Sequence, residues 1–435
     1  MKYIQNTDSD IQKMLDSIGV SSFEDLLKLI VPEKLQLKDK LNIGEPKSEL
    51  DLIMDTDNIK RKNKTLTCYN GGGVYDHYIP SVVDFISSRS EFYTSYTPYQ
   101  AEVSQGTLQY LYEFQSMISA LSGLEVSNAS LYDGGSALAE ACSMSVNISN
   151  KDKILLSSTI NPSYIEVLKT YFSHRGVSIE FISHDSGISS KNKKFNFDDY
   201  ACVVIQSPNY YGLIENWKDW SSEIDGRAIL IAVSDPVSLS LLESPGECGA
   251  DIYCGEGQSL GNYMNFGGPF LGLLSSRIKY VRRMPGRIVG KTDDLNGKDG
   301  YVLTLQAREQ HIRRDRANSN ICTNQSLMAL RASVYMSLLG RKGLSEIAKI
   351  CFNKSQYAAK AISSLSGFKI PYGYNFIKEF VVESKASSVK IVENALNEGI
   401  SLSSLTGSNN KLLIAITEKR TKEDIDSLVC FLEKQ

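Results

Sequence analysis

Short β-rich runs alternate with amphipathic helical segments through the middle of this chain. The β-rich runs are 154–158, 177–183, 201–207 and 228–234, and the helical segments between them are 162–175 and 214–224. Two further apolar runs, 251–255 and 270–276, follow them. Strands that are connected through helices lie parallel, and a parallel sheet is stable only when helices cover both of its faces. The sequence therefore predicts an α/β fold with a large, mostly parallel sheet.

The pattern changes on both sides of this region, so we expect more than one domain. A chain of 435 residues is too long for a single core. We expect a helical arm over residues 1–70, in which Asp8 and Ser22 cap short amphipathic helices. The large α/β domain is expected over 71–325, and long helices with a small α+β domain over 326–435. The periodicity places the long helices at about 324–340 and 343–366.

Composition and charge exclude several classes of function. The net charge of −3 gives no broad positive field, so nucleic acid is not an expected partner. No signal peptide is recognisable, and no apolar run approaches the roughly 18 residues of a membrane span. Eight scattered cysteines form no CxxC pair, and four histidines lack metal-site spacing. We therefore expect a cytoplasmic protein with reduced cysteines and no metal.

Two short segments lie where ligands bind in α/β folds. The run Asp133, Gly134, Gly135 and Ser136 opens a helix, and the free N–H groups of such a helix favour an anion such as phosphate. A simple helix cap is the alternative. Asp235 follows the β-rich run 228–234, at the carboxyl edge of the sheet. Its carboxylate can hold a protonated ring nitrogen, or it can cap the short helix that begins after it.

Two other segments resemble surfaces that contact a second protein. Tyr93, Tyr96 and Tyr99 gather around Pro98, and their spacing fits neither a helix nor a strand. A rigid, exposed aromatic loop of this kind is typical of a protein interface. Residues 308–325 are rich in polar groups just before a long helix. This second segment is either a solvated helix entry or a contact across a subunit boundary.

Several strings, in order from about residue 70 to about residue 330, carry a family resemblance. They are YDHYIP, YTPYQAEVSQGTLQ, ASLYDGGSALAEA, SPGECGADI, GEGQSLG with FGGPFLG, MPGRIVG, and LTLQAREQHIRRD with SNICTNQ. Together they resemble glycine dehydrogenase (decarboxylating), the P-protein of the glycine cleavage system. The resemblance is to the first subunit of its split, two-chain bacterial form. It implies the type I fold of pyridoxal-phosphate enzymes and an α2β2 heterotetramer with a second, different subunit.

The resemblance also implies that the second subunit, and not this one, binds pyridoxal phosphate through a lysine. That lysine precedes a glycine-rich turn, and the matching position here, eleven residues before Pro269, is Gln258. The chain has no lysine between Lys218 and Lys279. A glutamine amide is not nucleophilic and cannot form a Schiff base. We therefore expect a vestigial pocket that performs no covalent step. Its residues are Gly134, Gly135, Ser136, Asp235 and Gln258.

The implied reaction is decarboxylation of glycine on pyridoxal phosphate, followed by transfer of the aminomethyl group to the lipoyl group of H-protein. By family position, Ser319 with Asn320 is expected to reach the cofactor phosphate of the partner subunit. We expect Tyr96, Pro98 and Tyr99 to line the partner's glycine pocket. Two alternatives stay open. One is an independent pyridoxal-phosphate enzyme that uses Lys279 or Lys291, and the other is a non-catalytic scaffold on the same fold.

Overall fold

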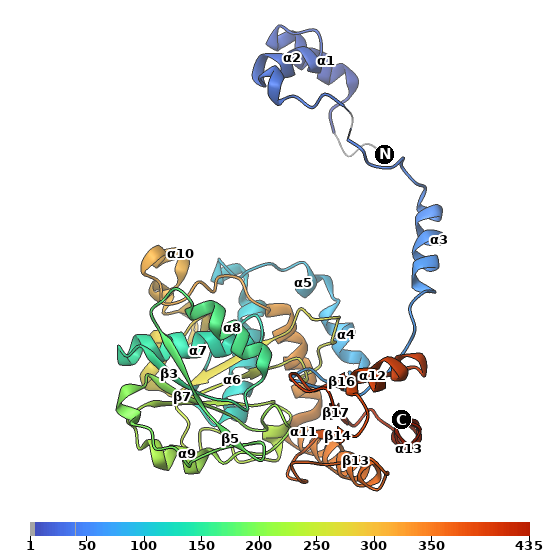
Figure 1. Cartoon of the computed structure of the whole chain (residues 1–435). Coiled ribbons are helices and arrows are strands. Elements are labelled where there is room, and N and C mark those ends of the chain that lie inside the picture. The colour runs from blue at the N-terminus through green and yellow to red at the C-terminus, as the bar shows by residue number, and fades with distance from the viewer. Residues whose placement is uncertain (1–4, 40) are drawn as a thin grey trace. The chain divides into compact units, whose positions relative to one another are not determined.

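The computed structural model describes residues 5–39 and 41–435, and the chain divides into two compact units, Met1–Lys64 and Thr65–Gln435 (Figure 1). The helices of the first unit are α1 (Asp8–Ile18), α2 (Phe23–Ile30) and α3 (Glu49–Lys60). Ser22 caps α2 as predicted, but α1 is capped by Thr7 and not by Asp8, which is its first helical residue. Among the described residues, no helix is long and apolar enough to cross a membrane.

A seven-stranded sheet forms the centre of the second unit, with the strand order β2-β10-β9-β8-β7-β3-β4. These strands are β2 (Val126–Ser127), β3 (Lys153–Ser157), β4 (Ser178–Ile182), β7 (Cys202–Gln206), β8 (Ile229–Val233), β9 (Ile252–Glu256) and β10 (Gly272–Ser276). Five of them are parallel, and β10 runs antiparallel to both of its neighbours. The predicted α/β fold with a mostly parallel sheet is confirmed.

Helices cover both faces of this sheet (Figure 1). On one face lie α6 (Gln105–Ser122), α9 (Trp217–Ile224) and the first part of α11 (Ser326–Ser363), and on the other lie α7 (Gly134–Ser149) and α8 (Pro162–Phe172). Successive strand residues alternate between two cores: Val203 and Ile205 of β7 face the first, and Val204 faces the second. The carboxyl edge of the sheet is left for polar side chains.

A smaller antiparallel sheet, β13-β14-β17-β16, follows the long helix α11. Its elements are β13 (Phe368–Lys369), β14 (Glu379–Ser384), β16 (Ser403–Ser404) and β17 (Lys411–Ala415), with helices α12 (Ser388–Asn397) and α13 (Lys422–Glu433). The predicted pair of helices over 324–340 and 343–366 is confirmed: α11 consists of two helices that meet at a kink, where the backbone of Gly340 is non-helical. The end of α11 packs into the small core through Ala358 and Ile362.

The segment after residue 66 links the two sheets. Strand β1 (Thr67–Cys68) pairs with β15 (Ile400–Ser401), and the chain then passes along the carboxyl edge of the large sheet. The remaining elements are α4 (Ser81–Ser87), α5 (Ser90–Tyr93), α10 (Gln310–Arg313), β5 (His184–Asp185), β6 (Ile188–Ser189), β11 (Ile288–Asp293) and β12 (Asp299–Thr304). Side chains from three separate parts of the sequence therefore meet at this edge.

Candidate functional site

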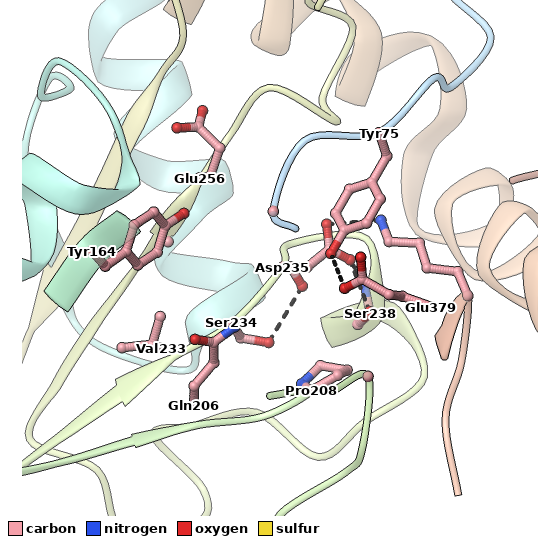
Figure 2. A pocket seen from close by; sticks show the side chains of 14 residues that line it. Tyr75, Tyr164, Gln206, Pro208, Val233, Ser234, Asp235, Ser238, Glu256 and Glu379 are labelled. Carbon is pink, nitrogen blue, oxygen red and sulfur yellow. Dashed lines mark hydrogen bonds and ion pairs between the residues drawn. The ribbon is translucent and has the colours of Figure 1, made fainter. Parts of the chain in front are cut away.

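The carboxyl ends of β7, β8 and β9 meet at a small cavity (Figure 2). Asp235 and Glu256 line it from the large sheet, and Lys378 and Glu379 line it where β14 begins. Open α/β sheets bind ligands at this edge. The cavity has a volume of about 30 Å³, which is room for one or two water molecules. Small-molecule sites usually have about 300–1,000 Å³, so this cavity is too small for such a ligand.

Asp235 is a buried carboxylate whose two oxygen atoms are both bonded within the chain. Its Oδ1 lies 2.9 Å from Nζ of Lys378 and accepts the hydroxyl of Ser259 at 3.0 Å. Its Oδ2 accepts the N–H and the hydroxyl of Ser238 at 2.9 and 2.8 Å. Burial alone would raise the pKa of Asp235, but the ammonium of Lys378 holds it below its usual value. Asp235 therefore caps the turn at Ser238, and its charge is already paired.

Lys378 is a buried cation that sequence patterns did not identify. Besides Asp235, its Nζ lies 3.0 Å from Nε2 of His77 and 3.8 Å from the centre of the Tyr75 ring. An ammonium group can only donate, so Nε2 of His77 accepts and the other ring nitrogen carries the hydrogen. A carboxylate, an imidazole nitrogen and an aromatic face thus replace the water that burial removes.

Glu379 binds the small domain to the segment that passes along the cavity. Its Oε1 accepts the N–H of Gly72 at 2.5 Å, and its Oε2 accepts the hydroxyl of Tyr75 at 3.0 Å. Burial raises the pKa of Glu379 to about 7, and these two donors oppose the rise. This carboxyl group, like that of Asp235, is committed to contacts inside the chain.

Glu256 fills the space at the amino-terminal end of α7. Its Oε2 accepts the N–H of Gly134 at 2.9 Å, and its Oε1 accepts the N–H groups of Gln258 and Leu271, also at 2.9 Å. Burial raises the pKa of Glu256 to about 8, although the N–H groups of Leu271 and Gly134 lower it. A side chain at Gly134 would clash with Tyr164, whose Oη would lie 2.4 Å from the added Cβ. The helix end is therefore in close contact with the chain's own side chains.

Gln258 is fully bonded through its side-chain amide. Its Nε2 donates to the carbonyl oxygens of Tyr75 and Asn262 at 3.1 and 2.7 Å, and its Oε1 accepts the N–H of Tyr75 at 2.9 Å. The residue is 1% exposed. The amide therefore fixes the segment around residue 75 and has no donor free for a ligand.

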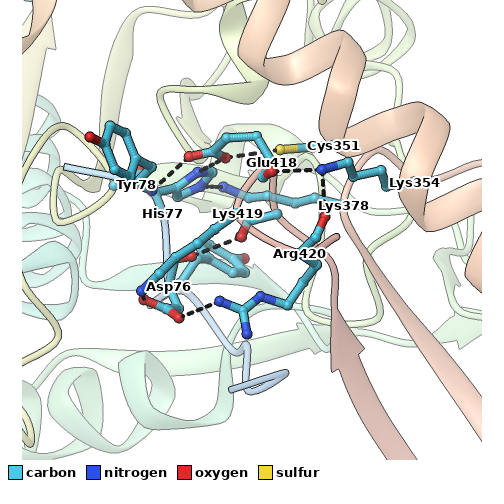
Figure 3. A network of polar contacts seen from close by, with 12 residues as sticks. Asp76, His77, Tyr78, Cys351, Lys354, Lys378, Glu418, Lys419 and Arg420 are labelled. Atoms are coloured by element: carbon cyan, nitrogen blue, oxygen red, sulfur yellow. Dashed lines mark hydrogen bonds and ion pairs between the residues drawn. The ribbon is translucent and has the colours of Figure 1, made fainter. Parts of the chain in front are cut away.

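A second polar network continues from His77 toward the loop after β17 (Figure 3). Nδ1 of His77 donates to Oε2 of Glu418 at 2.6 Å, and the N–H of Tyr78 donates to Oε1 at 2.7 Å. Burial would raise the pKa of Glu418, but these partners hold it at about 2. His77, Cys351 and Glu418 are the one group of possible metal ligands found in the described residues. Nζ of Lys354 donates to the backbone carbonyl of Glu418 and Nζ of Lys378 to Nε2 of His77, so the network is better described as a hydrogen-bonded anchor.

The residues predicted to act in a partner's site lie outside the cavity. Tyr96 and Tyr99 are 72% and 61% exposed in the loop between α5 and α6, and Pro98 between them is buried. Ser319 is half-buried, accepts the N–H of Ile321 at 3.1 Å and contacts Glu140. Asn320 is exposed. None of these five residues lines the cavity.

Comparison with known proteins identifies the family. The family described as glycine cleavage system P-protein matches residues 1–432. The chain belongs to this family. It is 48% identical over 440 residues to the probable glycine dehydrogenase (decarboxylating) subunit 1 of Desulfitobacterium hafniense, covering 99% of this chain and 98% of that protein. The protein of the same name from Chloroherpeton thalassium is 43% identical over 439 residues, with the same coverage.

Solved structures agree with this assignment. Glycine decarboxylase (P-protein) of the glycine cleavage system, in inhibitor-bound form, superposes with a TM-score of 0.93 at 35% identity, covering 100% of both chains. A glutamate decarboxylase from Lactobacillus brevis shares the fold alone, with a TM-score of 0.67 at 12% identity over 92% of this chain and 95% of that one. The predicted family and the type I pyridoxal-phosphate-enzyme fold are confirmed.

Pyridoxal phosphate, the cofactor that the family resemblance implies, does not fit the pocket of this P-protein chain. Its phosphate would require the amino-terminal end of α7, where Glu256 is bonded to Gly134. Its ring nitrogen would require Asp235, which is bonded to Lys378. Its aldehyde would require a lysine where the amide of Gln258 is fully bonded. We therefore assign no chemical step of this cofactor to the pocket of this chain.

The sequence predicted only part of this P-protein pocket. Asp235 lines the cavity, while Gly134 and Gln258 are bonded to its lining residues Glu256 and Tyr75. Glu256, Tyr75, Lys378 and Glu379 were missed. One signal was present: Lys378 and Glu379 interrupt the apolar run FIKEFVVE, and charges in a buried strand need partners.

Proposed function

We propose that this chain is the first subunit of a two-subunit glycine dehydrogenase (decarboxylating), and that a second, different subunit holds pyridoxal phosphate covalently. The proposed assembly is an α2β2 heterotetramer. The observation that carries the proposal is Gln258. At the position where the family resemblance expects a lysine, a buried amide uses both of its hydrogens and its oxygen in bonds to this chain. Full-length similarity to proteins named subunit 1 supports the same division of labour.

The proposed enzyme removes CO₂ from glycine and transfers the remaining aminomethyl group to the lipoyl group of H-protein. Pyridoxal phosphate in the partner subunit supplies the electron sink for decarboxylation. This chain would contribute shape and water exclusion to the partner's site.

The exposed tyrosine loop is the proposed contribution to glycine binding. Tyr96 and Tyr99 are large rings that this chain leaves in solvent, and their centres lie 6.4 Å apart. Glycine is so small that bulky groups must close its pocket, and rigid rings exclude water at little entropy cost. The phenolic hydroxyl groups can also orient the substrate carboxylate. Pro98 restricts the backbone between the two rings.

Ser319 and Asn320 are the proposed contribution to cofactor binding in the partner. The hydroxyl of Ser319 is half-buried, accepts the N–H of Ile321 and contacts the carboxyl group of Glu140, so binding a phosphate of the partner would replace the contact with Glu140. A phosphate oxygen of the partner's cofactor is the acceptor that the family resemblance implies.

Reconstitution of the complex tests this function. The chain and the second subunit are expressed separately and together, and exchange of labelled bicarbonate into the carboxyl group of glycine is measured with lipoylated H-protein. We expect exchange only when both subunits are present, and H-protein without its lipoyl group is the matched control. A fully assembled complex without exchange would refute the decarboxylase function and favour the scaffold alternative.

The second alternative, an independent pyridoxal-phosphate enzyme, is tested with the isolated chain. Lys279 and Lys291 are 62% and 42% exposed and pair with Asp251 and Asp299. Among the described residues, the lysine that lines the cavity is Lys378, whose Nζ lies 2.9 Å from Oδ1 of Asp235. After incubation with pyridoxal phosphate and borohydride reduction, we expect no labelled lysine by mass spectrometry. A specifically labelled lysine together with glycine exchange by this chain alone would favour the alternative.

A further inference from the structure

Loss of a lysine alone would leave an open pocket, and this pocket is closed. Pyridoxal phosphate bears a phosphate at one side of its ring and a protonatable nitrogen at the other, and a type I pocket must meet both. Figure 2 shows Glu256 on one side of the cavity and Asp235 on the other. Groups of this chain are bonded at both places, and they come from different domains.

At the first place, the carboxyl group of Glu256 stands where an anion would bind. The N–H of Gly134, at the start of α7, donates to Glu256 at 2.9 Å, and the N–H groups of Gln258 and Leu271 donate to its other oxygen. A helix amino terminus with free N–H groups is an anion site. Here Glu256 accepts one N–H of α7, that of Gly134, together with two N–H groups from outside the helix, and Asp133 accepts the N–H of Ser136.

At the second place, the ammonium of Lys378 stands where a ring N–H⁺ would bind. Its Nζ lies 2.9 Å from Oδ1 of Asp235 and over the ring of Tyr75 at 3.8 Å. The other carboxylate oxygen accepts twice from Ser238. A cation brought by a ligand therefore finds no unpaired oxygen on Asp235.

We propose that Glu256 and Lys378 are built-in substitutes for the two polar ends of pyridoxal phosphate. They close the pocket of this subunit to phosphorylated pyridines and join the small domain to the large one. The proposal rests on the proposed function only in taking Gln258 as the former lysine position. It implies that restoring a lysine is not sufficient to restore cofactor binding, because both binding ends remain occupied.

A stepwise restoration in the full-length chain tests this proposal. Four variants are compared: Gln258→Lys alone, the same change with Glu256→Ser, the same change with Lys378→Ala, and all three changes together. Binding of pyridoxal phosphate is measured by equilibrium dialysis and by the visible absorbance that borohydride abolishes. We expect no saturable binding for Gln258→Lys alone. Each further change should tighten binding by at least about tenfold, because it frees charge-assisted hydrogen bonds for the ligand.

Matched controls separate local from general effects. Glu243→Ser and Lys369→Ala remove exposed members of ion pairs with Lys218 and Glu383. Added to Gln258→Lys, neither should change cofactor binding. Circular dichroism establishes whether each variant is folded. If the triple variant does not fold, the two variants with two changes still show whether Glu256 and Lys378 exclude the cofactor.

Two results would overturn the proposal. One is tight binding by Gln258→Lys alone, which would mean that the pocket is open. The other is a set of folded variants that all fail to bind, which would mean that Glu256 and Lys378 are not what excludes the cofactor. Neither result bears on exchange by the natural complex, so failure here is distinct from failure of the proposed function.

Discussion

The closed pocket and the segment before α11 are both rich in polar side chains, but they differ in how these side chains are bonded. In the pocket, Gln258 and Asp235 make their bonds within the chain. In and near the segment, four buried atoms have no hydrogen-bond partner among the described residues. They are Nε of Arg287, Nε and Nη2 of Arg308, and Oε1 of Glu309. Buried donors and acceptors without a partner are costly. The first region is complete in one chain, whereas the second is expected to be completed by another.

The tyrosine loop belongs with the second region. Its rings are exposed although aromatic side chains gain most from burial. Residues 308–325 show features of both interpretations that the sequence left open: side chains 311–316 are exposed, and Arg308 and Glu309 carry buried atoms without a partner among the described residues. On the proposed function, the comparison separates groups that hold this chain together from groups that would contact a second subunit.

Removal of Lys378 should have the largest effect and tests whether the pocket is self-sufficient. Lys378→Met leaves the buried carboxylate of Asp235 unpaired, so the free energy of unfolding should fall by about 3–5 kcal/mol. Adding Asp235→Asn removes the second charge and should recover part of that loss. Urea unfolding, followed by tryptophan fluorescence, measures both. The control Lys369→Met breaks an exposed pair and should cost less than about 1 kcal/mol. Equal losses of unfolding free energy in Lys378→Met and Lys369→Met would contradict the view that the pocket is held together by its own buried bonds.

Ser319→Ala tests the second region at the cofactor. In the assembled complex, loss of a hydrogen bond to the partner's cofactor phosphate should weaken pyridoxal-phosphate retention by about 1.5–3 kcal/mol. Dialysis of the complex against buffer of decreasing cofactor concentration gives the affinity. Ser364→Ala, at the exposed end of α11, is the control. Unchanged retention in Ser319→Ala would limit Ser319 to its local bond with Ile321.

The pH dependence of stability tests Glu256. Burial raises its pKa from 4.5 to about 8 in the folded chain, so the folded state binds the proton more tightly than the unfolded state. The resulting stability is complete below about pH 4.5 and is lost as the pH rises toward about 8. Its slope is at most about 1.4 kcal/mol per pH unit. Glu256→Gln should flatten the fall of the unfolding free energy between about pH 5 and pH 8. An identical slope in wild type and variant would show that Glu256 does not titrate there.

Tyr96→Phe and Tyr99→Phe should have the smallest effects. Each removes one hydroxyl group and should lower the glycine exchange rate by about two- to tenfold, as expected for one hydrogen bond. The alanine variants remove the walls as well and should be slower still. Sedimentation should show intact assembly in every case. Normal exchange in all four assembled variants would remove the loop from the active site and leave it as packing.

Much of the fold was predictable because its signal is local. The runs around 154, 201 and 228 became β3, β7 and β8, since a buried parallel strand is an apolar run whatever lies elsewhere in the chain. The two helices predicted over 324–340 and 343–366 are confirmed, because the backbone at Gly340 is non-helical and separates them. Helix ends depend on the few residues around them, which is also why Thr7 displaced Asp8 as a cap.

The pocket was only half predictable because its other half is distant in sequence. Asp235 and Gln258 lie in segments of the large domain whose position at the sheet edge follows from the strand pattern. Lys378 reaches the same edge only after the small domain has folded back, and no local pattern encodes that contact. Glu256 ends a buried strand, so its charge could have been noticed, but its partner Gly134 could not have been named. Pairings of this range depend on the tertiary fold.

Pro98 is buried between two exposed tyrosines, and this has a thermodynamic consequence for assembly. The ring fixes the φ angle of its residue, and its burial anchors the loop to this chain before any other protein is present. Conformational freedom of the loop is therefore lost when the chain folds and need not be lost again when subunits associate. In the proposed complex, Pro98→Gly would shift that loss to the association step. Calorimetry would then record a less favourable binding entropy with little change in the contacts made.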